Sequence, residues 1–134
     1  MGRLSLSFVS ALVIMYAVTF LVYGSVAAAT GLEPPEGASP GVFLLSVLVV
    51  KIGLAAAFVL IFYIARQALV GRWVPYAFAW WLMFVVAEVG QAIGPNYGWT
   101  EAIAGIVSET VYCPLAALVT NWLLRPTVPR VTGT

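Results

Sequence analysis

Four long apolar segments follow one another along the chain, separated by short polar stretches. Each segment is close to the roughly 20 residues that a helix needs to cross a bilayer. We therefore predict four transmembrane helices, at about residues 8–29, 41–65, 73–94 and 102–124. Glycine, proline and most of the charged residues lie between them, where they favour turns. The short connections predict an all-α, compact up-down bundle that forms a single transmembrane domain over residues 1–134.

The amino-acid composition indicates whether this chain is surrounded by water or by lipid. Of its 134 residues, 63% are hydrophobic and only 8% are charged, whereas a soluble domain has about 25% charged residues. Lipid must therefore be the main solvent, and the lipid bilayer is the first expected partner. The net charge of +1 and the lack of a basic cluster exclude nucleic acid as an expected partner.

The basic and acidic residues outside the spans segregate between the two ends of the predicted bundle. The arginines fall at one end: Arg3, Arg66, Arg72, Arg125 and Arg130. The acidic residues fall at the other: Glu33, Glu36 and Glu101. By the positive-inside rule, both termini are expected in the cytoplasm, and the acidic loops outside. The expected location is a prokaryotic inner membrane.

Three charged residues lie inside the predicted spans: Lys51, Glu88 and Glu109. A charge at bilayer depth costs several kcal/mol and is usually turned inward, where it is paired or functional. At 1.5 Å of rise per residue, these residues lie about 16, 10 and 12 Å from the outer loops. Three helices thus deliver their intramembrane charges to one depth band, which indicates a single cluster.

Helical spacing extends this cluster, because residues three and four apart share a face. One stripe consists of Trp81, Phe84, Glu88 and Gln91, and the next helix carries Gly105, Ser108, Glu109, Tyr112, Cys113 and Ala116. The predicted ligand- or proton-binding residues are Glu88, Glu109, Lys51, Gln91 and Tyr112. The predicted cavity-lining residues are Trp81, Phe84, Ser108 and Cys113.

Three interpretations of the cluster remain open. Lys51 could simply pair with one acid, while the other is protonated or bonded to Gln91 or Tyr112. The group could instead bind a cation, or hold a proton, since two carboxylates and one ammonium leave an excess negative charge in a medium of low dielectric. It could also meet charges of another subunit.

The absence of histidine in the sequence narrows the chemistry. Bis-histidine haem, histidine-based zinc and Glu-x-x-His di-iron sites are excluded, and a serine or cysteine nucleophile would lack its usual base. No cofactor and no metal are expected, and enzymatic activity is the least favoured function.

The leading hypothesis is a small proton- or cation-coupled transporter or channel, with a Glu/Glu/Lys site in the outer half of the bilayer. Such a protein would work as an oligomer, and Gly90 and Gly94 form a small-xxx-small pattern that permits close helix approach. The alternatives are an accessory or assembly subunit of a larger membrane complex, and a membrane protein that binds lipid or another hydrophobic ligand.

Overall fold

The protein is all-helical. The computed structural model describes residues 2–33 and 39–125, so Glu36 and Arg130 lie outside the described residues. Its helices are α1 (Gly2–Thr30), α2 (Pro40–Ile64), α3 (Arg66–Leu69), α4 (Trp73–Ile93) and α5 (Trp99–Leu124). Four of them, α1, α2, α4 and α5, are long and apolar enough to cross a membrane. This confirms the prediction of four such helices in an all-α chain.

Side-chain hydrogen bonds to backbone amides cap the N-termini of α2 and α5. At the start of α2, the Ser39 side chain accepts a hydrogen bond from the Val42 amide at 3.3 Å, and Pro40 occupies the first turn, where its missing N–H costs nothing. At the start of α5, the Glu101 carboxylate accepts a hydrogen bond from the Gly98 amide at 2.7 Å. This hydrogen bond is one of the two that make up a capping box. Helix α5 accordingly begins at Trp99, three residues before the predicted start at residue 102.

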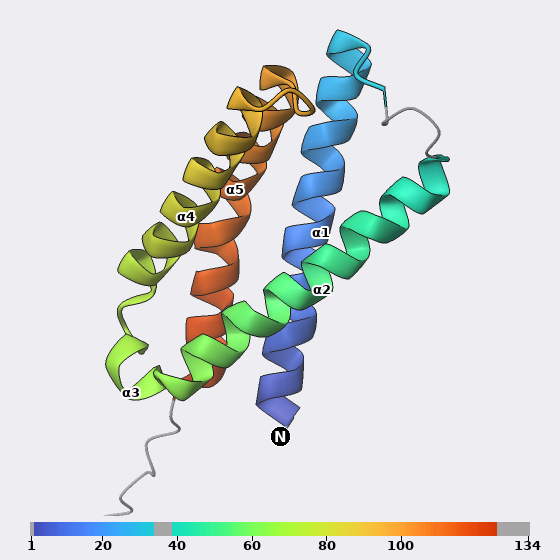
Figure 1. Cartoon of the computed structure of the whole chain (residues 1–134). Coiled ribbons are helices and arrows are strands. Elements are labelled where there is room, and N and C mark those ends of the chain that lie inside the picture. The colour runs from blue at the N-terminus through green and yellow to red at the C-terminus, as the bar shows by residue number, and fades with distance from the viewer. Residues whose placement is uncertain (1, 34–38, 126–134) are drawn as a thin grey trace, which may run out of the picture.

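Helix α5 is the centre of the fold and packs against both α1 and α4 (Figure 1). Many of its buried residues are small: Ala102, Ala104, Gly105, Ser108, Ala116 and Ala117. On α1, the buried residues recur every fourth position: Ser7, Ala11, Met15 and Thr19. Small side chains let helix backbones approach closely, which is how helices associate without a hydrophobic driving force.

Helix α2 crosses α1 diagonally rather than lying parallel to the other helices (Figure 1). Aromatic side chains fix its C-terminal half to α4. The Tyr76 hydroxyl donates a hydrogen bond to the Phe58 carbonyl, and the Tyr76 ring lies 4.8 Å from that of Phe58 and 5.1 Å from that of Phe62. The N-terminal half of α2 diverges from α4 and α5, so the helices are spread apart at that end of the molecule.

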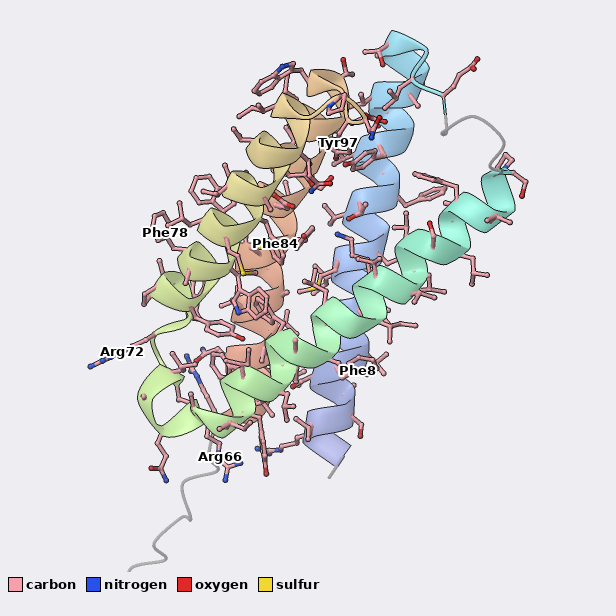
Figure 2. All side chains as sticks on the ribbon, viewed as in Figure 1. Phe8, Arg66, Arg72, Phe78, Phe84 and Tyr97 are labelled. Carbon is pink, nitrogen blue, oxygen red and sulfur yellow. The ribbon has the colours of Figure 1, made fainter. Side chains whose placement is uncertain are left out.

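The described ends of the chain lie at the same end of the fold. The Arg3 guanidinium donates a hydrogen bond to the Arg125 carbonyl at 3.2 Å. Arg66 and Arg72 lie at this end too, around α3 (Figure 2). The loop after α1 and the turn between α4 and α5 lie at the opposite end, with Glu33 and Glu101. The fold thus separates the described arginines from the acidic loop residues.

Candidate functional site

A cavity of about 480 Å³ lies where α2 diverges from the other helices, towards the end with the acidic loops. Two walls come from the diverging pair. From α1 they are Tyr16, Thr19, Phe20, Tyr23, Gly24 and Ala27, and from α2 they are Phe43, Leu44, Ser46, Val47, Val50 and Lys51. The third wall comes from α4, α5 and the turn between them: Glu88, Asn96, Tyr97, Glu101, Gly105, Ser108, Glu109 and Tyr112. Leu32 and Glu33 complete it at the loop after α1.

The cavity brings together the three charged residues that the sequence places inside the spans. Lys51, Glu88 and Glu109 come from three different helices and all line it. The two carboxylates interact with Lys51 through space. Among the described residues, however, none of their oxygens forms an ion pair with Lys51 within 4.0 Å. The cavity wall therefore carries opposite charges that are close but not paired.

Tyr112 holds the ammonium group of Lys51. Lys51 Nζ donates a hydrogen bond to the Tyr112 hydroxyl at 3.3 Å, and it lies 4.5 Å from the centroid of that ring. A cation over an aromatic face gains about 0.5–2 kcal/mol. The Tyr112 ring is itself fixed by the Phe84 ring, at 6.2 Å in an edge contact. One end of the polar cluster is thus a lysine bound to a neutral partner.

Glu109 is a buried carboxyl group of the cavity with no hydrogen-bond partner for its Oε2 atom among the described residues. Its residue surface is only 6% exposed. A buried carboxylate that lacks partners costs several kcal/mol if it stays ionised. Among the described residues, an ionised Glu109 would therefore have only its longer-range interaction with Lys51 as compensation.

Glu88 ends a chain of hydrogen bonds between side chains. The Tyr97 hydroxyl donates to Glu88 Oε2 at 2.7 Å, and the Tyr23 hydroxyl lies 3.2 Å from that of Tyr97. Tyr23 also lies within hydrogen-bond distance of the Glu101 carbonyl, at 3.2 Å. Figure 2 shows Tyr97 in the turn after α4, beside the neighbouring part of α1. These contacts tie α1 to the turn between α4 and α5 across one end of the cavity.

Tyr97 lies outside the apolar helices, and burial, followed by the hydrogen bonds to Tyr23 and Glu88, raises the pKa of its phenol above the usual value of 10.0. The phenol therefore stays protonated at neutral pH and can donate its hydrogen bond to Glu88.

The other sequence-predicted site residues lie in different places. Ser108 lines the cavity. Cys113 is fully buried in the apolar core behind it. Phe84 packs against Trp80 and Tyr112 rather than lining the cavity.

Trp81 and Gln91 lie away from the charged cluster. Trp81 Nε1 donates to the Thr110 hydroxyl at 2.9 Å, which joins α4 to α5 outside the cavity. Gln91 is exposed and does not line the cavity. The carboxylate of Glu88 on the same helix is instead reached by the turn after α4.

Besides Tyr112, which the sequence predicts as a site residue, the cavity is lined by Tyr16, Tyr23 and Tyr97, which it does not. A signal was present, since Tyr16, Thr19 and Tyr23 are spaced three and four residues apart in an otherwise apolar segment, which places them on one helix face. That stripe faces the cavity.

Within residues 2–33 and 39–125, no three histidine, cysteine, aspartate or glutamate side chains gather as metal ligands would. The chemistry that these residues offer is proton exchange at carboxyl groups, hydrogen bonding from phenols, and cation binding against acids and aromatic rings. No protein-family model, curated protein or solved structure matches this chain.

Proposed function

We propose that the protein is a small integral membrane protein whose cavity binds a compact organic cation in exchange for a proton, as part of a proton- or cation-coupled transporter. Four helices of sufficient length and apolar character support membrane residence. So do their outward faces, on which large apolar side chains are exposed: Leu21, Val49, Ile64, Val86 and Ile93. In water such faces would drive aggregation, whereas lipid solvates them.

The arrangement of charges supports an orientation. Arg3, Arg66, Arg72 and Arg125 lie at one end of the described structure, and basic residues favour the cytoplasmic side. Both termini are then cytoplasmic, in a prokaryotic inner membrane, and the cavity lies in the outer half of the bilayer.

The observation that carries the proposal is the carboxyl group of Glu109. It lines a cavity large enough for a small ligand, it is buried, and one oxygen has no partner among the described residues. Cavities of about 300–1,000 Å³ are typical of small-molecule sites. A carboxyl group in this setting holds a proton until a cation takes its place, and this exchange is the elementary step of proton-coupled cation transport.

The aromatic residues of the cavity support an organic cation over a bare metal ion. Tyr112 already holds an ammonium group, that of Lys51. Four further aromatic residues line the cavity: Tyr16, Phe20, Tyr23 and Phe43. Aromatic faces bind alkylammonium groups through their negative electrostatic potential while they also solvate an attached apolar chain.

Binding and proton release test the proposal together. The purified protein in lipid nanodiscs is titrated with nonylamine in weakly buffered solution, with empty nanodiscs as the blank. A pH indicator reports released protons. We expect saturable binding with proton release in the wild type, and at least a tenfold loss of affinity together with loss of proton release in Glu109→Gln.

Glu33→Gln serves as the matched control, because Glu33 also lines the cavity but is exposed. It should keep both binding and proton release. If Glu109→Gln keeps both as well, Glu109 is not the exchange site and the proposal fails.

A second candidate is a protein that binds a hydrophobic ligand or lipid without transporting it. The apolar lining from α1 and α2, which includes Phe20, Phe43 and Val47, favours it. Proteoliposomes separate the two candidates. Uptake of nonylamine driven by a pH gradient supports the transporter, whereas saturable binding without uptake supports the ligand-binding protein. The roles of accessory subunit and homo-oligomer remain predictions from the sequence.

A further inference from the structure

The cavity offers two unfilled polar groups of opposite charge. On the α2 wall, Lys51 has three N–H donors, and the Tyr112 hydroxyl is its hydrogen-bond acceptor among the described residues. On the α5 wall, Glu109 Oε2 has no partner among the same residues. Glu88 differs, because Tyr97 already donates to it. The Thr19 hydroxyl also lines the cavity without a partner among these residues, but it is neutral. Of the charged groups of the cavity that are not exposed, Lys51 and Glu109 are therefore the two that lack a charged or hydrogen-bonded counterpart matching their charge.

These two groups do not satisfy each other. Among the described residues, no ion pair within 4.0 Å links Lys51 to Glu109, although both line the same cavity. A ligand with only a cationic head would meet Glu109 but would also face the positive charge of Lys51. A ligand with only an anionic head would meet Lys51 but face the acids. A head with both charges satisfies both walls.

Tyr112 links the positions of the two groups. Lys51 Nζ lies over the Tyr112 ring, 4.5 Å from its centroid. Tyr112 is three residues from Glu109 on α5, and residues at that spacing are neighbours, with about 5–6 Å between their Cβ atoms. Glu109 and the residue that holds Lys51 are thus neighbours on one helix, so a single ligand head in the cavity can lie beside both charged groups. The apolar walls of α1 and α2, which include Phe20 and Phe43, accommodate a tail.

We propose that the cavity binds a compact zwitterionic amphiphile, with its ammonium group against Glu109, its anionic group against Lys51 and its apolar tail between α1 and α2. This inference rests on the proposed function, because the cation that is exchanged for a proton becomes the ammonium of the zwitterion. Two sources share this chemistry: a free amphiphilic amino acid, with a carboxylate as the anionic group, and a phosphoethanolamine lipid head, with a phosphate.

A matched set of probes tests the inference in lipid nanodiscs at pH 7, by equilibrium dialysis with empty nanodiscs as the blank. The zwitterion is 2-aminodecanoic acid. Nonylamine is the same molecule without the carboxyl group, and decanoic acid is the same molecule without the amine. We expect the wild-type protein to bind the zwitterion at least tenfold more tightly than either single-charge probe.

Variants at Lys51 assign this selectivity to one residue. Lys51→Met should lower the affinity for 2-aminodecanoic acid to that for nonylamine, and leave nonylamine binding equal or tighter. Lys51→Arg keeps the charge and should keep at least half of the selectivity on a logarithmic scale. Dihexanoyl phosphatidylethanolamine, as a fourth probe, identifies the source: tighter binding than 2-aminodecanoic acid indicates the lipid head, and weaker binding indicates the amino acid.

The outcomes separate this inference from the proposed function. The inference of a zwitterionic ligand is wrong in either of two cases. In the first, the wild-type protein binds nonylamine as tightly as 2-aminodecanoic acid. In the second, Lys51→Met leaves the preference for 2-aminodecanoic acid over nonylamine unchanged. Nonylamine binding that still depends on Glu109 would then leave the proposed function standing. If Glu109→Gln changes the binding of no probe, both fail. The comparison of probes on the wild-type protein needs no variant. It can therefore refute the inference even if the Lys51 variants misfold.

Discussion

In the cavity wall, the Glu88 side chain of α4 lies against Gly105 of α5. A Cβ atom added at Gly105 would lie 2.5 Å from both Cδ and Oε1 of Glu88, and 2.9 Å from Oε2. These distances are too short for any real contact. Because the atoms belong to the end of a flexible side chain, Gly105→Ala should displace the carboxyl group and leave the backbone in place. The displaced carboxyl group would lose its 2.7 Å hydrogen bond from Tyr97.

The expected change in stability is the difference between two effects. A hydrogen bond to a charged group contributes roughly 1.5–3 kcal/mol, and replacing glycine by alanine inside a helix gains about 1 kcal/mol. The net loss expected for Gly105→Ala is therefore about 0.5–2 kcal/mol. Gly90→Ala is the matched control, since Gly90 lies inside α4 and an added Cβ there meets nothing within 4 Å. It should gain about 1 kcal/mol.

Cys113 provides the assay. It is the only cysteine of the chain and is fully buried, so a thiol-reactive dye becomes fluorescent only when the core opens. Heating the detergent-solubilised protein with this dye gives an apparent midpoint of thermal unfolding. We expect the midpoint of Gly105→Ala below that of the wild type, and the midpoint of Gly90→Ala above it.

A double-mutant cycle isolates the cause. In a Glu88→Ala background the side chain that Gly105→Ala would meet is gone, so Gly105→Ala should now stabilise the protein as Gly90→Ala does. If Gly105→Ala raises the midpoint in the wild-type background too, or lowers it equally in both backgrounds, Glu88 does not lie against Gly105 and the described cavity wall is incorrect.

Three further outcomes are expected. Tyr76→Phe removes the buried hydrogen bond to the Phe58 carbonyl and should cost about 1 kcal/mol in the same thermal assay; an unchanged midpoint would contradict the contact. Asn121→Leu removes the acceptor that lies 2.8 Å from the Gly71 amide, so exchange of that amide with deuterium should accelerate at least tenfold, and equal rates would refute the contact. Because burial chiefly raises the pKa of Tyr97 above 10.0, the folded state keeps a proton that the unfolded chain releases, and stability should fall as pH rises above about 10. Tyr97→Phe should make that fall less steep, and identical slopes would contradict the shift.

The sequence was sufficient for the helices and for one face of α5. Length and apolar content predict α1, α2, α4 and α5, because a helix of this kind satisfies its own backbone polar groups whatever lies beside it. Periodicity also identified the stripe that includes Gly105, Glu109, Tyr112 and Ala116, all of which are buried. Side chains three and four residues apart must share a face, so this inference needs no knowledge of neighbouring helices.

The sequence could not show which neighbour each face meets. Trp81 and Glu88 lie close to one face of α4, but Trp81 bonds to Thr110 on α5, whereas Glu88 bonds to Tyr97 in the turn. The diagonal crossing of α2 depends on contacts such as that of Tyr76 with Phe58, and helical spacing carries no information on interhelical angles. For the same reason, the sequence could not show that Tyr112 holds Lys51 while Glu109 has no partner among the described residues.

The packing of α5 against α1 has a consequence for the order in which the protein forms. Helix α1 is synthesised before α2 and α4, yet its most extensive neighbour, α5, is made after them. Until α5 arrives, α1 can pack against α2 but lacks this larger contact. The packing of α1 is therefore completed only after α5 has been made, and a ribosome that stops after α4 leaves α1 without its most extensive neighbour and open to quality control.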